Sequence, residues 1–403
     1  MIVFAAAQVV LLIFLGLMIL SYLRFHREYM PLLSSLGWEV SNDQVLIIVP
    51  AKDEEASIGQ CLERLVQLNG IANFKIVAVN DRSEDQTEVV MHEVAAKYPG
   101  RIEVVGIQHL PEGWLGKNHA CWTGAQQGLK AMPGARFLLF TDGDLKFHPD
   151  TVLESITWMN RRKLDFMTLI EDSEFEGILE PAYLLLFGIF LVFFTARPWL
   201  LHRKNGKNFM GNGAYLLSRR EAYEATEAHK TLRLEVVEDM RMGLLMRSRG
   251  YNCGTAVGLN RIRRRWQPGF VGIFKGLLKN FFAGFEYNVG LTLGGILFFP
   301  FVFLGPWICL FFGYPIIGGA GILMLATCCF LAGQNSRLPW LSGFLLSPFT
   351  CLVASANLAT SAFKILRDGG VTWRGTLYPI AELRAHCLTP RKAFQQARLE
   401  RGT

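Results

Sequence analysis

The sequence lacks the cysteine and histidine patterns on which small zinc-binding or disulfide-bonded domains depend. It has eight cysteines but no CxxC pair and no Cys/His pair at zinc spacing. Four of them lie in apolar stretches (Cys309, Cys328, Cys329 and Cys351). The signature GxxxxGK[ST] is also absent, which excludes a P-loop protein. There is no internal repeat or low-complexity segment, and 51% of the 403 residues are hydrophobic, so the composition excludes a disordered or fibrous chain.

Charged residues are missing from Met1 to Leu23, and this absence predicts a membrane segment. The run is long enough to cross a bilayer, which needs about 20 apolar residues. It has neither a basic start nor a small-residue cleavage site, so we expect residues 1–24 to be a retained transmembrane anchor. Arg24, His26 and Arg27 follow it. This basic flank favours an outside N-terminus and a cytoplasmic continuation.

Further apolar stretches predict a multi-pass protein of the cell membrane. The segment 178–201 contains Glu180 and Pro181. We expect an interfacial or re-entrant helix there, because a span would separate residues that share one site. Residues 271–288 are predicted as an amphipathic interface helix, and residues 289–363 as a C-terminal membrane region, preferably with two spans and a re-entrant stretch. Residues 364–403 are predicted as a basic cytoplasmic tail.

The net charge of +7 has two readings, nucleic-acid binding and membrane attraction. The basic residues cluster near the predicted membrane segments rather than on an aromatic-laced stripe. Attraction to anionic lipid headgroups is the simpler account, so no nucleic-acid partner is expected.

Residues 41–270 have the pattern of a cytoplasmic α/β domain. Short apolar or β-branched runs alternate with amphipathic stretches, as in parallel βαβ units. The predicted strands are 45–49, 74–79, 102–105, 137–140 and 166–170, and the predicted helices are 55–68, 84–97, 116–132 and 150–163. This order implies a doubly wound, mostly parallel sheet whose ligands bind beyond the carboxyl ends of its strands.

Acidic residues follow three of the predicted strands. Asp53 and Glu54 lie in VPAKDEE, Asp81 lies in VNDRS, and Asp142 and Asp144 lie in TDGDL. Carboxylate oxygens suit Mg²⁺ or Mn²⁺, which commonly bridges a protein and a substrate diphosphate. Each segment alone is also compatible with a polar turn or a helix cap. Their convergence at successive strand ends favours a ligand site.

Three later segments carry further candidate groups. Lys117 lies at a predicted helix N-terminus, where a diphosphate would offset its unfavourable interaction with the helix dipole, although an exposed lysine fits equally well. Glu238 and Asp239 begin another predicted helix, where one of them could deprotonate an acceptor hydroxyl or merely cap the helix. A basic cluster could neutralise a leaving diphosphate or form a patch that contacts the membrane surface. It consists of Arg261, Arg263, Arg264, Arg265 and Trp266.

The segments VPAKDEE, VNDRS, GWLGKNHA, TDGDL, GNGAY, VEDMR and RRRW occur in this order within residues 45–270. This part of the chain resembles the inverting family 2 glycosyltransferases, whose GT-A fold has a Rossmann-like, mostly parallel sheet. The anchor, GWLGKNHA, GNGAY and a late GGVTWRGTLYP (Gly369 to Pro379) look most like bacterial enzymes that act on carotenoid- or hopanoid-type lipids. Processive synthases of the family carry QxxRW, and Ile262 stands at the glutamine position. The resemblance therefore favours transfer of a single sugar.

The resemblance also implies a role for each matching residue. Asp239 would be the general base, and Asp142 and Asp144 would hold Mg²⁺ or Mn²⁺. The acceptor side would be formed by Gly211, Asn212, Gly213 and Glu238. The nucleotide-sugar would be bound by Pro50, Asp53, Glu54, Asp81, Lys117, Asp142, Arg265 and Trp266. The implied partners are a nucleotide-sugar, with uridine the family's commonest base, and a membrane lipid acceptor.

Two alternatives stay open. A polysaccharide or polyprenyl-phosphate glycosyltransferase would differ in its product. A non-catalytic scaffold that binds nucleotide-sugars would use the same fold without turnover. The intact Asp142, Asp144 and Asp239 speak against the scaffold.

Overall fold

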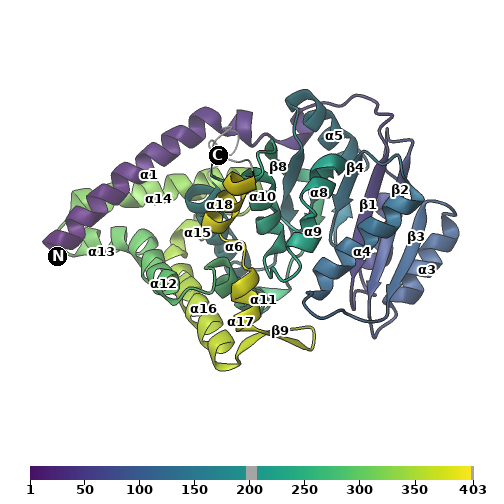
Figure 1. Cartoon of the computed structure of the whole chain (residues 1–403). Coiled ribbons are helices and arrows are strands. Elements are labelled where there is room, and N and C mark those ends of the chain that lie inside the picture. Colours follow the sequence, from purple (N-terminus) through teal and green to yellow (C-terminus); the bar gives the residue numbers. More distant parts are fainter. Residues whose placement is uncertain (197–206, 401–403) are drawn as a thin grey trace. The chain divides into compact units, whose positions relative to one another are not determined.

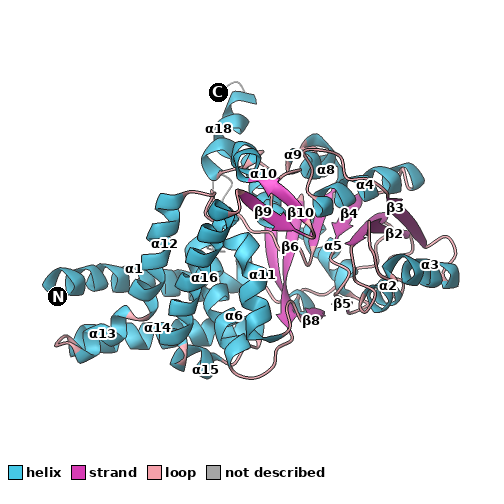
Figure 2. Cartoon of the chain, turned by 90° about the horizontal axis from the view of Figure 1, so that it is seen from below, coloured by secondary structure: helices cyan, strands magenta, loops and turns pink. Residues whose placement is uncertain are grey.

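The computed structural model describes residues 1–196 and 207–400, which form two compact units (Figure 1). The sheet unit comprises residues 29–172, 207–264 and 386–400, and the helical unit comprises residues 1–28, 173–196 and 265–385. Each unit is thus built from segments that are far apart in the sequence. Apart from one hairpin, the strands belong to the sheet unit (Figure 2).

The sheet unit is built on an eight-stranded sheet with the order β3-β2-β1-β4-β7-β6-β8-β5. Four strands run parallel, β1 (Val45–Ala51), β2 (Phe74–Asp81), β3 (Ile102–Ile107) and β4 (Phe137–Phe140). β7 (Leu216–Arg219) pairs antiparallel with both β4 and β6 (Phe166–Ser173), and β5 (Lys146–Phe147) pairs antiparallel with β8 (Cys253–Arg264). The five predicted strands are confirmed, whereas β5, β7 and β8 are additional to them.

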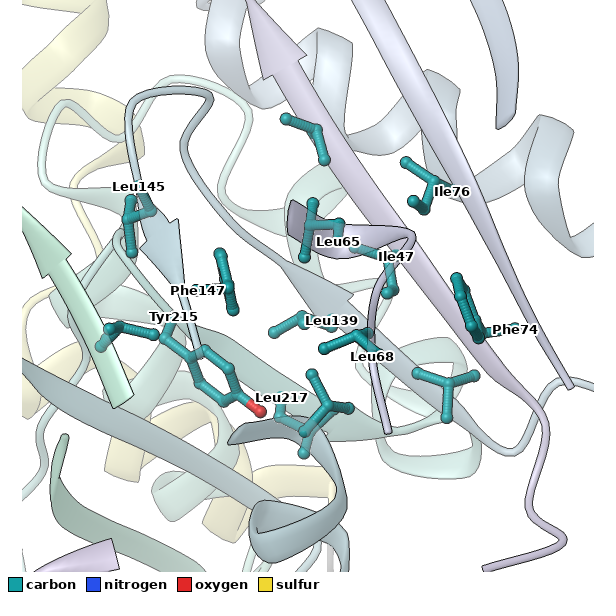
Figure 3. Close-up of a cluster of buried hydrophobic side chains, with 14 of the residues drawn as sticks. Ile47, Leu65, Leu68, Phe74, Ile76, Leu139, Leu145, Phe147, Tyr215 and Leu217 are labelled. Carbon is teal, nitrogen blue, oxygen red and sulfur yellow. The ribbon is translucent and has the colours of Figure 1, made fainter. Parts of the chain in front are cut away.

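Both faces of the sheet are buried. Val45, Ile47 and Val49 of β1 join one apolar cluster, and the intervening Leu46 and Ile48 join the other. This two-sided burial explains why β1 reads as a continuous apolar run. The first cluster contains residues of α2 (Ile58–Leu65), α3 (Thr87–Lys97) and α5 (Thr151–Arg162), and part of it is drawn in Figure 3. The second contains residues of α4 (Gly116–Ala131), α8 (Arg220–Ala225), α9 (Ala228–Thr231), α10 (Glu238–Ser248) and α18 (Pro390–Glu400).

Glycines let α4 lie close against the sheet. A Cβ atom at Gly124 would lie 2.7 Å from the Ile48 and Val79 side chains, and one at Gly128 would lie 2.6 Å from the Leu46 side chain. Larger residues would push the helix outward. The close packing therefore fixes the N-terminus of α4, which carries Lys117, beside the ends of β1 and β2.

The helical unit contains three helices that are long and apolar enough to cross a membrane, within the described residues. They are Ile2–Arg24 of α1 (Ile2–Tyr29), α14 (Pro315–Ser336) and α16 (Ser347–Arg367). A fourth span is possible if α12 (Val289–Phe303) and α13 (Gly305–Phe311), bent by 48°, count as one. The unit also contains α11 (Gly269–Gly284), α15 (Trp340–Leu345), the hairpin β9 (Gly370–Trp373) and β10 (Thr376–Pro379), and α17 (Ile380–His386).

Two segments bear on the predicted membrane arrangement. Of the predicted helix over 178–201, the structure describes α6 (Leu179–Ile189) and a π-helix (Phe190–Ala196), and the apolar helix Leu179–Phe193 is shorter than the candidate spans. Residues 197–201 lie outside the described residues. The predicted tail, 364–403, starts inside α16, and its last described helix, α18, belongs to the sheet unit. Residues 401–403 are also outside the described part.

Candidate active site

The acidic groups predicted at strand ends follow three neighbouring strands of the sheet. β2, β1 and β4 are adjacent in the sheet. Asp81 is the last residue of β2, Asp53 follows β1, and Asp142 follows β4. The backbone N–H of Glu84 donates to Asp53 Oδ1 at 2.8 Å, and the N–H of Asp53 donates to Ser83 Oγ at 3.1 Å. These bonds join the turn after β1 to the turn after β2. The carboxyl edge of the sheet is therefore a connected acidic surface.

Asp142 lies between two cations. Lys117 Nζ is 2.7 Å from Asp142 Oδ1, and Arg264 Nη1 is 2.8 Å from Asp142 Oδ2. Lys117 Nζ also lies 3.0 Å from Glu238 Oε1, and Arg264 Nε lies 3.1 Å from Glu171 Oε1. Residues from the turn after β4 and from α4, α10, β8 and β6 thus meet in one charged cluster.

Burial and charge act in opposite directions on this cluster. Burial disfavours charge on Lys117, but Asp142 and Glu238 outweigh it and hold the Lys117 pKa well above its ordinary value. Burial likewise opposes ionisation of Asp142, but Lys117 and Arg264 hold the Asp142 pKa below its usual value. The Asp142 carboxylate is therefore anionic and Lys117 is cationic at neutral pH.

Asp144 is the least satisfied carboxylate of the cluster. Its Oδ1 is buried and has no hydrogen-bond partner among residues 1–196 and 207–400, and Arg264 Nη1 lies 3.8 Å away. Burial, with a contribution from Asp142, raises the Asp144 pKa above its ordinary value despite the nearby Arg264. A cation beside Asp144 would relieve both conditions.

The charge balance and the oxygen donors of the cluster fit a divalent metal that also binds substrate. Asp142, Asp144, Glu171 and Glu238 provide four carboxylates against the two cations Lys117 and Arg264. The described residues contain no group of three or more His, Cys, Asp or Glu side chains arranged as a complete metal site. Mg²⁺ is commonly held by only one or two carboxylates together with substrate phosphates, so Asp142 and Asp144 fit such an ion.

The GNGAY segment holds Asp239 beside this cluster. The N–H of Gly213 donates to Asp239 Oδ2 at 2.9 Å, and the N–H of Met240 donates to Asp239 Oδ1 at 2.7 Å. A Cβ atom at Gly213 would lie 3.0 Å from Lys117 Nζ, 3.4 Å from Asp239 Oδ2 and 3.6 Å from Asp142 Oδ2. Three of the predicted site residues therefore converge on the bare face of Gly213.

The neighbouring residues of that segment are fixed by their own contacts. The N–H of Asn212 donates to Thr168 Oγ1 at 3.0 Å, and its side-chain amide binds the Leu169 carbonyl oxygen at 2.9 Å and the Glu171 carboxylate. A Cβ atom at Gly211 would lie within 2.5 Å of the Asp239 carbonyl carbon. Glycine is therefore required at 211 for α10 to begin where it does.

The residues predicted for the nucleotide lie around the ends of β1 and β2. Asp81 is buried, and its Oδ1 accepts a hydrogen bond from Arg82 Nε at 2.8 Å. Pro50 lies within β1, opposite Val79. The N–H of Glu54 donates to Thr87 Oγ1 at 2.7 Å, and a Cβ atom at Gly143 would lie 2.7 Å from Glu54 Oε2. Glu54 thus lies beside the turn that carries Asp142 and Asp144.

Arg265 and Trp266 are not brought into this cluster. Both belong to the helical unit, where Arg265 binds Glu176 at 2.6 Å and Glu180 at 3.1 Å. The roles predicted for them remain predictions. The preceding residue, Arg264, makes the contact with Asp142 instead.

Strand geometry explains the difference between these arginines. In β8, Ile262 and Arg264 are buried on the same face, whereas Arg261 and Arg263 alternate with them. Arg261 binds Glu154 at 2.6 Å, and Arg263 binds Asp172 at 3.0 Å. The predicted basic cluster is thus a set of separately paired arginines. Glu171 was also missed, although it directly follows the predicted strand 166–170, and the strand-end rule would have found it.

Comparison with known proteins agrees with this geometry. The family model described as glycosyltransferase like family 2 matches residues 42–258, which is more than half of the chain. The chain belongs to glycosyltransferase family 2. This glycosyltransferase has the GT-A fold predicted from its motifs, and the match spans the predicted strands and all of the cluster except Arg264.

Relatives of the glycosyltransferase include two named 4,4'-diaponeurosporenoate glycosyltransferase. The one from Staphylococcus haemolyticus is 23% identical over 231 residues, 57% of this chain and 58% of the relative. The one from Staphylococcus aureus is 25% identical over 242 residues, 59% and 60% of the two chains. The chain thus spans about three fifths of the length of the curated relatives that it matches.

A solved structure shows the same fold. It is a mannosyltransferase from Pyrobaculum calidifontis in complex with GDP-Man and Mn²⁺, with a TM-score of 0.51 and 15% sequence identity. The likeness covers 91% of this chain and 99% of that one.

Proposed function

We propose that this glycosyltransferase moves a single sugar, with inversion, from a nucleotide-diphosphate sugar to a membrane lipid of carotenoid or hopanoid type. The observation that carries the proposal is the convergence of Lys117, Asp142 and Asp239 on Gly213. It places candidate groups for the leaving diphosphate and for the attacking hydroxyl beside one another.

The donor would bind across the carboxyl edge of the sheet. Asp81 and Asp53 lie at the ends of β2 and β1, where a base and ribose can accept or donate hydrogen bonds. Lys117 and Arg264 both contact Asp142 in this structure. With the donor bound, each would donate some of its hydrogen bonds to the diphosphate. UDP-sugar is the donor that we propose, because uridine is the commonest base in the family that the motifs resemble.

Asp142 and Asp144 would hold Mg²⁺ or Mn²⁺ together with diphosphate oxygens. The support is the buried Asp144 Oδ1 and the excess of carboxylates over cations in the cluster. When bound, the metal would stabilise the negative charge of the departing nucleoside diphosphate.

Asp239 would act as the general base. It would take the proton of the acceptor hydroxyl while that oxygen forms a bond to the anomeric carbon, and the bond from that carbon to the diphosphate would break on the opposite face. The N–H groups of Gly213 and Met240 hold the two carboxylate oxygens in place. Lys117 and Arg264 would compensate the charge that develops on the leaving group.

The lipid acceptor is supported by two independent features. The helical unit has three helices long enough to cross a membrane within the described residues, more than a simple anchor requires. The curated relatives carry the name of a carotenoid-type acceptor. We propose a multi-pass protein of the cell membrane, with the sheet unit in the cytoplasm where nucleotide-sugars are made.

The test is a transfer assay with purified full-length protein and labelled UDP- and GDP-sugars. Bacterial lipid extract would be the acceptor source, with and without Mn²⁺. We expect metal-dependent labelling of one neutral lipid by the wild type and loss of that labelling in Asp239→Asn. Asp150→Asn is the matched control, because Asp150 likewise lies at the start of a helix of the sheet unit but accepts a hydrogen bond from Asn69.

The products separate the alternatives. A labelled polymer or a charged lipid phosphate would replace our proposal with the polysaccharide or polyprenyl-phosphate reading. Donor binding without any turnover would favour the scaffold. Unchanged labelling by Asp239→Asn would refute the assignment of the base.

A further inference from the structure

The C-terminal residues 386–400 pack against the helix that carries Asp239. Ala393 and Ala397 of α18 are 2% and 1% exposed, and Ala393 belongs to the same apolar cluster as Leu244 and Leu245 of α10. Arg241 Nη2 of α10 contacts Cys387 Sγ at 3.8 Å. This segment lies outside residues 42–258, the part that the family model covers.

Glu235 connects the C-terminal segment to the loop before α10. Its side chain is 4% exposed, and it accepts a hydrogen bond from the backbone N–H of Leu388. Its Oε2 also lies 3.8 Å from Nε of the buried Arg241. A buried carboxylate is costly unless such partners satisfy it, so the position of this loop depends on the C-terminal segment.

The same loop is attached to the start of α4. The side-chain amide of Asn118 donates to the carbonyl oxygens of Leu232, at 2.7 Å, and Glu235, at 3.0 Å. The N–H of Leu115 donates to the carbonyl oxygen of Arg233 at 2.8 Å. The loop therefore lies between α4, which provides Lys117, and residues 386–400.

We propose that residues 386–400 are a clamp that positions Asp239 for catalysis, with Glu235 as the residue through which the clamp acts. The inference rests on the proposed function, in which Asp239 is the base. Glu235 is three residues before Glu238, so a shift of the loop changes the start of α10. An error of about 1 Å in such a position can lower a rate about 100-fold.

The clamp affects catalysis more than donor binding. Asp53 and Asp81 lie at the ends of β1 and β2 and have their own hydrogen bonds. Lys117 also contacts Asp142, and the packing of Gly124 and Gly128 on β1 and β2 holds α4 independently of the loop. Loss of the clamp therefore lowers kcat and leaves the KM for the donor nearly unchanged.

The first experiment undocks α18 in the full-length protein. Ala393→Glu with Ala397→Glu places two carboxylates in the buried face of α18, and Gln396→Glu with Leu399→Glu adds the same charge to its exposed face. We expect kcat to fall about 10- to 100-fold in the first variant, with donor KM within about twofold, and no change in the second. Equal kcat in both variants and the wild type overturns the clamp.

The second experiment tests Glu235 itself. Glu235→Gln keeps a side-chain oxygen that can accept the Leu388 N–H, whereas Glu235→Ala does not. We expect kcat of Glu235→Gln to stay within about threefold of the wild type and kcat of Glu235→Ala to fall about tenfold or more, as for a lost hydrogen bond to a charged group. Equal losses in the two variants would assign the effect to the Arg241 ion pair and overturn the link to the clamp.

Hydrogen exchange separates failure of the clamp from failure of the proposed function. Amide protection of residues 232–239 needs no donor or acceptor, and we expect it to fall in Ala393→Glu with Ala397→Glu but not in the exposed-face control. Retained protection overturns the clamp. If the wild type transfers no sugar to any lipid but protection falls as expected, the proposed acceptor is wrong and the clamp stands.

Discussion

Replacement of Arg264 tests whether this buried arginine holds the acidic site together. Its side chain is 9% exposed and contacts Asp142 at 2.8 Å and Glu171 at 3.1 Å. In Arg264→Gln, Asp142 keeps Lys117, but Glu171 keeps, among the described residues, only the neutral Asn212 amide. Removal of one partner from a buried ion pair costs about 3–5 kcal/mol, so we expect a loss of this size in the free energy of unfolding.

The loss should depend on pH in a defined direction. Without the guanidinium, the Asp144 pKa, which burial already raises, rises further in the folded state, and the Asp142 pKa loses one of the two cations that lower it. Groups with raised folded-state pKa values favour folding at low pH, and that contribution disappears as the pH rises through them. The free energy of unfolding of the variant should therefore lie further below that of the wild type at pH 7 than at pH 4.

Thermal unfolding in detergent at both pH values measures this effect, and a calorimetric titration measures donor affinity. We expect donor binding to weaken about 10- to 100-fold, since a hydrogen bond to a charged group contributes about 1.5–3 kcal/mol. The stability and donor affinity of Arg264→Lys should lie between those of the wild type and Arg264→Gln. One ammonium group cannot contact Asp142 and Glu171 as the guanidinium does.

Lys97→Gln is the control, because it also removes one positive charge from the sheet unit, and both Lys97 and its partner Glu63 are exposed, at 60% and 42%. Exposed pairs contribute only about 0–1 kcal/mol. If Arg264→Gln unfolds at the wild-type temperature and binds donor equally well, the electrostatic account of the site is wrong.

Three other predictions concern the site and its surroundings. In Gly211→Ala the new methyl group would collide with the Asp239 backbone. Initial-rate measurements should therefore show kcat about 100-fold lower than in the wild type. The control is Gly294→Ala, which should leave kcat unchanged because a Cβ atom at Gly294 has no described atom within 4 Å. Chelation by EDTA should abolish transfer and Mn²⁺ should restore it, and Asp144→Asn should raise the Mn²⁺ concentration for half-maximal rate about tenfold or more. Burial lowers the His229 pKa from 6.5 to about 3, so the unfolded state binds more protons below pH 6.5. Stability should then fall by about 1.4 kcal/mol per pH unit between 6.5 and 3, and acid titration followed by tryptophan fluorescence should show a shallower slope in His229→Gln.

The parallel half of the sheet could be predicted from the sequence because each of its strands and helices has a pattern that is visible within a short stretch of the chain. β1 and β2 are buried on both faces and read as apolar runs, and α4 follows them with its own helical pattern. The acidic residues after these strands then follow from the geometry of parallel sheets. In contrast, β7 has four residues, and its place between β4 and β6 depends on pairing partners far along the chain.

The choice between Arg264 and Arg265 could not be made from composition. A shift of one residue in the limits of a strand exchanges the buried and exposed faces, and four arginines in five positions fit either register. The structure places a backbone irregularity at Asn260, with φ of 61°, just before this run. Such an irregularity inside a strand can change which of the following side chains face the sheet's core, and no local pattern predicts it.

The packing of the C-terminal segment on α10 was missed for a different reason. The buried face of α18 is made of Ala393 and Ala397, which give little hydrophobic signal, while the charged residues around them suggest a solvated tail. Small residues allow close packing on α10, but their spacing alone does not reveal it.

The arrangement of the sheet unit along the chain also bears on its synthesis. The unit receives its last described segment only from residue 386 onward, and 121 residues separate this point from Arg264. At about 5–20 residues per second, a ribosome needs roughly 6 to 24 s to make that stretch. During this interval the nascent chain has the edge of the sheet that we propose binds the donor, but not the segment that packs on α10. We therefore expect the nascent protein to become active only after the helices preceding residue 386 have been delivered to the membrane.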